Sequence, residues 1–170
     1  MQVVIDSVSL NHLLRQPKAS SKSRRPLQVR ENLLDEWIRL KKITLAIDFP
    51  LGLVDEWVKT CGPDIKVLVA RWGDLKGIVL IKNLRNPEQS IGRRLKILGF
   101  GDDPIDKLIL RIALGTIDRT IVSDDSDFWD PKKPNDRRIK GNPKAPVAKV
   151  CKEELKVTIL LLKMLIDILK

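Results

Sequence analysis

The chain has 170 residues and a formal net charge of +10, with 43% hydrophobic and 32% charged residues. This length fits one domain of ordinary size, and the composition argues against a disordered chain or a membrane protein. The longest apolar stretch, at 157–169, carries Lys163 and Asp167 and falls short of the ~20 apolar residues that a membrane-spanning helix needs. No basic leader precedes the first apolar residues, so the chain is expected in the cytoplasm, without a membrane partner.

Cysteine and histidine are too scarce to carry the chemistry of a site. The chain has two cysteines, Cys61 and Cys151, and one histidine, His12. A disulfide framework needs more cysteines, and a zinc site needs three or four nitrogen or sulfur ligands at suitable spacing. We therefore expect reduced, buried cysteines, and any catalysis must depend on carboxylates.

Short apolar segments alternate with helical patterns along the whole chain, which predicts an α/β fold. The predicted elements, in chain order, are a strand at 3–5, helices at 10–14 and 27–42, a strand at 43–47, a helix at 53–61, strands at 66–70 and 77–81, helices at 88–98 and 105–114, a strand at 120–122, a strand or helix at 147–150, and a C-terminal helix at 151–170.

This alternation predicts a single domain over 1–170 with a three-layer α/β/α architecture and a central, mainly parallel sheet. Two segments have loop composition, a basic one at 16–26 and a Pro- and Lys-rich insertion at 131–148. Neither an internal repeat nor a shift in composition indicates a second domain.

Carboxylates follow two of the predicted strands directly. Asp6 ends the first strand, and the strand at 120–122 leads into Asp124, Asp125 and Asp127. In a doubly wound sheet, ligands bind outside the carboxyl ends of the strands, so these acids are expected to converge if the two strands are neighbours. Like charges in such a cluster are costly unless a cation neutralises them, and hard oxygen ligands favour Mg²⁺ or Mn²⁺.

Aspartate also caps helices and stabilises turns, and this structural role is the alternative for each acid. We expect it for Asp103, which precedes Pro104, and for Asp118 in a loop.

Four acidic segments occur in a characteristic order: VVIDS at 3–7, LVDEW at 53–57, DPIDKL at 103–108, and TIVSDDSDF at 120–128. Together they resemble the four acidic motifs of PIN domains. The resemblance implies an α/β/α fold and metal-dependent endoribonuclease activity, often as the toxin of a toxin–antitoxin pair with an antitoxin protein as partner. It also implies that Asp6, Glu56, Asp106 and Asp125 form an acidic quartet, with Asp127 as a further metal ligand.

Three features depart from that pattern and leave assignments open. Val8 stands where the family often has a small polar residue. Asp124 competes with Asp125 for the role of metal ligand. Helical periodicity at 53–61 places Asp55 nearer the apolar stripe than Glu56, whereas the motif favours Glu56.

Two other functions fit parts of the sequence. The DSD at 125–127 is similar to the DxD of Toprim nucleases and primases, although that family has a Glu where this chain has Asp6. A catalytically silent PIN-like module that binds nucleic acid or a protein partner is the other, and Val8 favours it.

Basic residues gather in two blocks, at 15–30 and 132–144, and phosphate backbones are the polyanions that such blocks most often meet. RNA, or alternatively DNA, is the expected partner, and the candidate phosphate contacts are Arg24, Arg25, Lys132, Lys133, Arg137 and Arg138. The C-terminal segment is apolar on nearly every side. We expect either packing across the sheet, with its first part forming the last strand, or a homodimer through the C-terminal helix.

Overall fold

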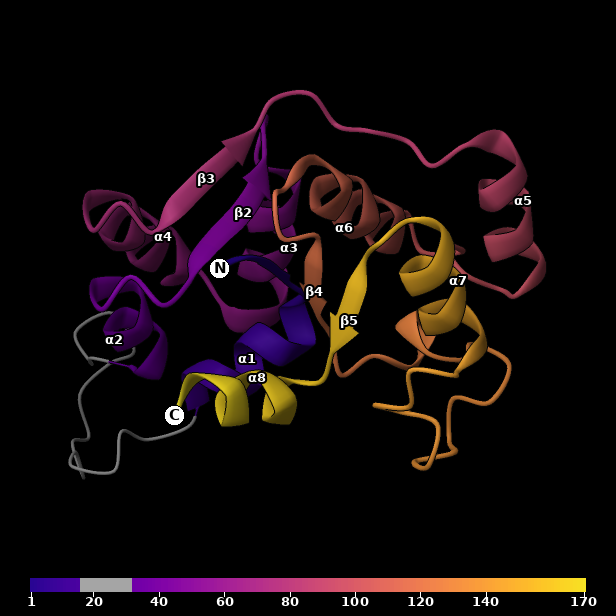
Figure 1. The fold of residues 1–170 in the computed structure, drawn as a ribbon. Helices are drawn as coiled ribbons and strands as arrows, with labels where there is room; N and C mark the ends of the chain where they lie inside the picture. Colours follow the sequence, from indigo (N-terminus) through magenta and orange to yellow (C-terminus); the bar gives the residue numbers. More distant parts are fainter. Residues whose placement is uncertain (16–31) are drawn as a thin grey trace.

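Five parallel strands form the central sheet in the order β3-β2-β1-β4-β5, and helices flank it (Figure 1). The structure is a computed structural model that describes residues 1–15 and 32–170. The predicted α/β class with a parallel sheet in a three-layer arrangement is confirmed. The strands are β1 (Gln2–Ile5), β2 (Thr44–Asp48), β3 (Ile78–Ile81), β4 (Thr120–Val122) and β5 (Thr158–Leu160).

The helices connect the strands in the manner of a doubly wound fold. They are α1 (Ser7–Arg15), α2 (Leu33–Arg39), α3 (Gly52–Cys61), α4 (Ile65–Asp74), α5 (Gln89–Ile97), α6 (Pro104–Gly115), α7 (Pro146–Glu154) and α8 (Leu162–Leu169), with a short 3₁₀ turn, η1 (Ser126–Phe128). The chain runs from β1 outward through β2 to β3, then returns through α5 and α6 to β4 on the other side of β1. Strand order therefore reverses between β1 and β4, which is where ligands bind in such sheets.

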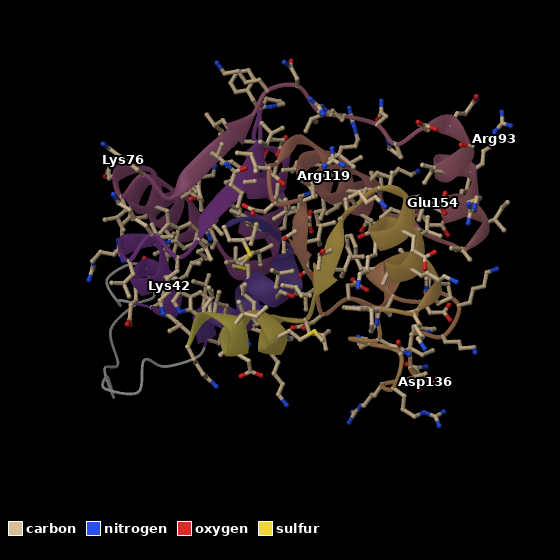
Figure 2. All side chains as sticks on the ribbon, viewed as in Figure 1. Lys42, Lys76, Arg93, Arg119, Asp136 and Glu154 are labelled. Atoms are coloured by element: carbon tan, nitrogen blue, oxygen red, sulfur yellow. The ribbon has the colours of Figure 1, made fainter. Side chains whose placement is uncertain are left out.

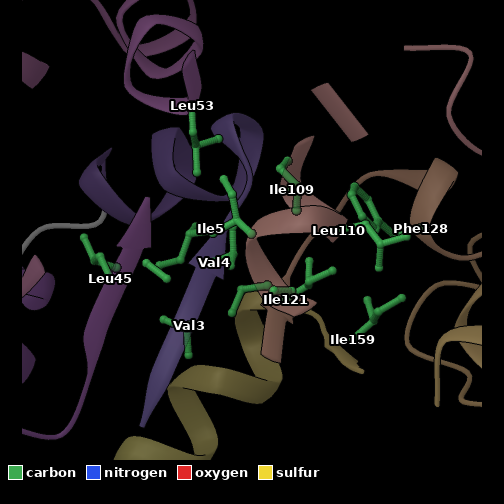
Figure 3. Packing of buried hydrophobic residues seen from close by; sticks show 14 of the residues in the cluster. Val3, Val4, Ile5, Leu45, Leu53, Ile109, Leu110, Ile121, Phe128 and Ile159 are labelled. Atoms are coloured by element: carbon green, nitrogen blue, oxygen red, sulfur yellow. The ribbon is translucent and has the colours of Figure 1, made fainter. Parts of the chain in front are cut away.

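The central strand is buried on both faces, as expected for a parallel sheet covered by helices. Val3, Val4 and Ile5 have no exposed surface. Figure 3 shows them among the side chains of neighbouring strands, with Leu53 from α3 and Ile109 from α6 packed nearby. This packing fixes the ends of β1 and β4, where the acidic residues begin.

Two predicted elements are wrong, and both errors concern apolar runs without clear periodicity. The predicted strand at 66–70 lies inside helix α4, whose buried residues Ile65, Leu68 and Trp72 have helical spacing. The predicted C-terminal helix at 151–170 contains the end of α7, strand β5 and helix α8. Its first part is thus the last strand, as one of the two interpretations expected.

The predicted basic insertion at 131–148 is shorter than expected, because Pro146 begins helix α7, so the undecided segment at 147–150 is helical. The predicted loop at 16–26 and the start of the helix predicted at 27–42 lie outside the described residues. At the start of the range 32–170, Asn32 and Asp35 form a capping box that begins α2.

No helix in the ranges 1–15 and 32–170 combines the length and hydropathy required to span a bilayer. Both cysteines are free. Burial raises the pKa of Cys151 to about 12, and the half-buried Cys61 has a pKa raised to about 11 chiefly by desolvation.

Candidate functional site

The carboxyl ends of β1 and β4 lie side by side. Ile5 pairs with Val122, and the backbone N–H of Asp6 donates to the Val122 carbonyl at 3.0 Å. Asp6 therefore leaves the sheet beside Ser123, at the point where strand order reverses. The register confirms the expectation that these two strands are neighbours.

Asp6 is 3% exposed, and its two carboxylate oxygens have different surroundings. Its Oδ1 accepts from the Ser9 N–H at 2.6 Å, which caps the first turn of α1. Its Oδ2 is buried without a hydrogen-bond partner among the described residues. Burial raises the pKa of Asp6, and the charges of Asp125 and Asp124 raise it further, whereas the nearby Ser123 hydroxyl and the Ser9 N–H lower it.

Asp106 lies in the first turn of α6 and is 6% exposed. Its Oδ2 is also buried and has no hydrogen-bond partner in the described part of the chain. Burial, followed by the charges of Asp127, Asp125, Asp103 and Asp6, raises the pKa of Asp106 to about 8. A carboxyl group in this position must be neutralised by a proton or by a cation.

The turn after β4 brings two further carboxylates to the same place. Asp125 caps η1, because its Oδ1 accepts from the Asp127 N–H at 3.1 Å and from Ser126 Oγ at 3.3 Å. Burial and the neighbouring charge of Asp125 raise the pKa of Asp127, whereas the nearby Asp106 carboxyl group lowers it. We call this group the acidic cluster: Asp6, Asp106, Asp125 and Asp127.

Asp124 has a different environment from Asp125. Its Oδ1 accepts from the Leu162 N–H at 3.1 Å, at the start of α8, and its Oδ2 lies 3.5 Å from Nδ1 of the exposed His12. Its own N–H donates to Ser9 Oγ at 2.9 Å. The side chain of Asp124 thus joins α1 and α8, which favours Asp125 over Asp124 as a metal ligand.

Glu56 is half-buried and forms an ion pair with Lys59 at 3.2 Å. It is not among the charges that act most strongly on the pKa values of Asp6, Asp106 and Asp127. The interaction that the structure shows for Glu56 is its ion pair with Lys59, and its place in the acidic quartet stays a prediction. Helical periodicity favoured Asp55 over Glu56 as the residue nearer the apolar face of α3, and that prediction is wrong, since Asp55 is exposed. The fully buried Leu53 places Glu56, and not Asp55, nearer that face.

Several polar residues near the cluster were not identified from the sequence. Asp48 ends β2 as Asp6 ends β1, and its two oxygens accept from the Gly52 and Leu53 N–H groups at 2.8 and 2.9 Å, so it caps α3. Ser9 and Ser123 are fully buried and accept from the N–H groups of Asp124 and Asp125. A small polar residue one turn after Asp6, and another directly before Asp124, were the signals available in the sequence.

Asp103 illustrates both roles that an aspartate can have. As expected, it caps α6, accepting from the Ile105 N–H at 2.8 Å. Its charge also raises the pKa values of Asp106 and Asp127, and the charge of Asp102 raises that of Asp127. The acidic field around the cluster is therefore stronger than the four motifs alone indicated.

Two buried tryptophans brace the strand ends that carry the acids. The indole N–H of Trp57 donates to the Ile5 carbonyl at 3.0 Å, and that of Trp129 donates to the Ser123 carbonyl at 3.3 Å. Both rings are almost fully buried, so these donors fix the backbone directly beside Asp6 and Asp124.

The basic insertion begins four residues after Asp127 and is largely exposed. Lys132, Lys133, Arg137 and Arg138 are all exposed, and Arg138 pairs with Asp136, which Figure 2 labels at the lower edge of the molecule. The middle of the insertion contacts the turn after β4, since Lys140 Nζ donates to the Asp124 carbonyl at 2.8 Å. Arg24 and Arg25, the other candidate phosphate contacts, lie outside the described residues.

A divalent cation fits the cluster by donor chemistry, though the ligand shell is not preassembled. Across 1–15 and 32–170, no three His, Cys, Asp or Glu residues are arranged so that they could hold one ion. The buried, unpartnered Oδ2 atoms of Asp6 and Asp106 are nevertheless the kind of hard oxygen that Mg²⁺ and Mn²⁺ take, with hydration completing the shell.

Comparison with known proteins gave no match: no protein-family model, no curated protein and no solved structure is significantly similar to this chain.

Proposed function

We propose that the chain is a Mg²⁺- or Mn²⁺-dependent nuclease that hydrolyses phosphodiester bonds in RNA through the acidic cluster. The observation that carries this proposal is the pair of buried carboxylate oxygens, Asp6 Oδ2 and Asp106 Oδ2, that have no hydrogen-bond partner among the described residues. They lie in a region where several negative charges oppose ionisation. Such a region is costly in a folded protein unless it binds a cation.

The residues of the cluster have distinct roles in this proposal. Asp6 and Asp125 bind the ion directly, at the ends of adjacent strands, while Asp106 and Asp127 complete its surroundings directly or through water. A bound divalent ion supplies an activated water and neutralises charge on the scissile phosphate, so no side-chain base is needed. Glu56 belongs to the quartet that the PIN resemblance implies, and its ion pair with Lys59 competes with that role.

RNA is favoured over DNA by the PIN resemblance. The exposed cations of the basic insertion support either polymer, because they would contact phosphates and not bases. The resemblance also implies a toxin–antitoxin pair, which co-purification with the product of an adjacent gene would test.

A cleavage assay with matched variants tests the nuclease. Wild type should cleave single-stranded RNA with Mg²⁺ or Mn²⁺ and not with EDTA. The double variant Asp6→Asn with Asp125→Asn should lose at least about 100-fold in rate, because replacing residues that only support a metal's ligands already costs about 10–100-fold. Asp124→Asn is the control, because asparagine can still cap α8 and should keep the activity. A folded wild type that cleaves neither RNA nor DNA with either metal would refute the proposal.

A catalytically silent, PIN-like binding module is the second candidate. The specific observation that favours it is that no three carboxylates in the described ranges are arranged to hold one ion. This module would bind RNA with the same affinity in EDTA and in Mg²⁺, and it would never cleave it.

A further inference from the structure

A pocket of about 340 Å³ opens between α5 and α6. This volume lies at the lower end of the ~300–1,000 Å³ range of small-molecule sites. Leu95, Phe100 and Leu110 supply its apolar wall. Gly92 in α5 leaves part of the space open, since a Cβ atom there would meet nothing nearer than Pro87 Cγ at 3.9 Å.

Three cations surround this apolar wall, and none of the described residues that line the pocket is acidic. Lys96 and Lys107 are exposed, and Arg111 is partly buried one turn after Lys107 on the same helix. The Nε atom of Arg111 is buried and has no hydrogen-bond partner among the described residues. A buried guanidinium donor without a partner is costly, and an anion is its natural complement.

The pocket and the acidic cluster are connected through helix α6 and through a contact between two phenylalanine rings. Asp106 and Lys107 are consecutive in α6, and Leu110 lies one turn after Asp106 on the same face of that helix. Phe100 packs edge-to-face on Phe128 with ring centroids 5.4 Å apart, and Phe128 directly follows Asp127; Figure 3 shows Leu110 beside Phe128. A ligand in the pocket would therefore lie next to a phosphodiester at the cluster.

We propose that this pocket binds one nucleotide unit of the substrate, with its base against the apolar wall and its phosphate held by Lys96, Lys107 and Arg111. The inference rests on the proposed nuclease function and adds a subsite to it. An apolar wall rimmed by cations fits a nucleoside phosphate better than it fits either an inorganic anion or an uncharged ring. The unpartnered Nε of Arg111 gives the phosphate a fixed donor, whereas the two lysines contribute charge.

Calorimetric titration of the intact chain in EDTA with each of the four ribonucleoside 5′-monophosphates tests the subsite without cleavage. At least one should bind saturably with a Kd at or below about 1 mM. The matching nucleoside and inorganic phosphate should each bind at least about 10-fold more weakly, which corresponds to a loss of about 1.4 kcal/mol.

Gly92→Leu should fill the pocket and weaken binding at least about 10-fold, while a leucine in place of a helical glycine preserves or raises stability. Gly73→Leu, at an open position in α4, is its matched control. Lys107→Gln should weaken binding several-fold, and Arg93→Gln, whose side chain points away from the molecule in Figure 2, should not.

The outcomes separate the subsite from the nuclease. No saturable binding of any monophosphate by a wild type that cleaves RNA would overturn the subsite and leave the nuclease standing. Binding equal for inorganic phosphate and for the monophosphates would overturn it as well, since the base would add nothing. Binding that Gly92→Leu abolishes, in a protein that cleaves no nucleic acid, would support the nucleotide site and refute the nuclease.

Discussion

Asp106 is the residue at which burial and like charge oppose ionisation most clearly. It is 6% exposed, and its pKa of about 8 means that without a cation the proton is largely retained at neutral pH. Asp127 lies close enough for its charge to be the first of the neighbouring charges that raise this pKa. A divalent ion bound at the cluster would displace the proton, because metal ligands bind in their deprotonated form.

Without divalent ions, stability should therefore fall as the pH rises. The pKa of Asp106 is 3.8 in its ordinary state and about 8 in the fold, so the folded state binds more protons between these values and loses stability across that window. In EDTA, the Tm should drop between pH 5 and pH 8 by at least about 3 °C, which is ~1 kcal/mol for a domain of this size. Asp106→Asn should reduce this drop, and the exposed Asp167→Asn should not. A Tm of wild type that stays constant over this range would contradict the shifted pKa.

Asp124 and Asp125 are adjacent, and the structure predicts opposite effects of replacing them. Asp124→Ala removes the acceptor for the Leu162 N–H and should cost about 1 kcal/mol of unfolding free energy, the usual value of a helix cap. Asp125→Asn should leave stability within about 0.5 kcal/mol and weaken Mn²⁺ binding. Urea unfolding and Mn²⁺ titration would measure the two effects, and weaker Mn²⁺ binding for Asp124→Ala alone would exchange the two assignments.

At the scale of elements, sequence patterns identified strands flanked by clear punctuation and failed where apolar residues were continuous. The segment 66–70 alternates too little to exclude either element, and its helical character depends on the buried Trp72, which lies beyond that window. The segment 155–169 is apolar because β5 is covered by α7 and α8, and α8 buries Leu162, Leu165 and Leu169. In both places the identity of the element follows from tertiary neighbours that a single sequence does not reveal.

The candidate site was predictable to a similar extent. Acids at the ends of β1 and β4 could be recognised because a strand end and its following carboxylate are adjacent in sequence. The choice between Asp124 and Asp125 depends on the path of the turn after β4. The position of α8 decides it, because the Leu162 N–H binds the side chain of Asp124. The direction in which Glu56 points depends on how α3 is rotated about its own axis. The burial of Leu53 against the core sets that rotation.

Asp35 connects α2 to α4, and replacing it tests whether that connection supports the fold. It is 1% exposed, accepts from the Trp72 indole at 2.8 Å, and pairs with Arg71 at 3.3 Å. Asp35→Ala removes one partner from this buried network and should cost about 3 kcal/mol of unfolding free energy. The matched change Asp74→Ala, at the exposed end of α4, should cost little. Urea unfolding would measure both, and equal values would show that the Asp35 network contributes nothing.

At the scale of the whole molecule, the fold removes most of the reason to expect a dimer. Leu165 is fully buried, so the apolar residues that α8 still exposes are Met164, at 38%, and Ile168, at 61%. We expect light scattering at micromolar concentration to give the mass of one chain, 19.4 kDa. Twice that mass, lost on replacing Ile168 by Glu, would instead support a homodimer through α8.

The exposed cations of the basic insertion should make the affinity of the chain for RNA depend on salt, if they contact phosphates. This insertion begins four residues after Asp127, and Lys140 joins it to the Asp124 carbonyl, one residue before Asp125. RNA bound at the cluster would therefore pass beside the exposed cations of the insertion. Affinity for single-stranded RNA in EDTA should fall with salt, with a log–log slope of about −0.7 per phosphate contact. Replacing the four exposed cations of the insertion by Ala should flatten the slope by up to about 3, since four contacts would be lost; these are Lys132, Lys133, Arg137 and Arg138.

Replacing four exposed lysines of other segments controls for net charge alone, and these are Lys41, Lys66, Lys76 and Lys163. If both sets flatten the slope equally, the insertion has no specific place in the RNA interface, because a nonspecific field depends on total charge and not on its position.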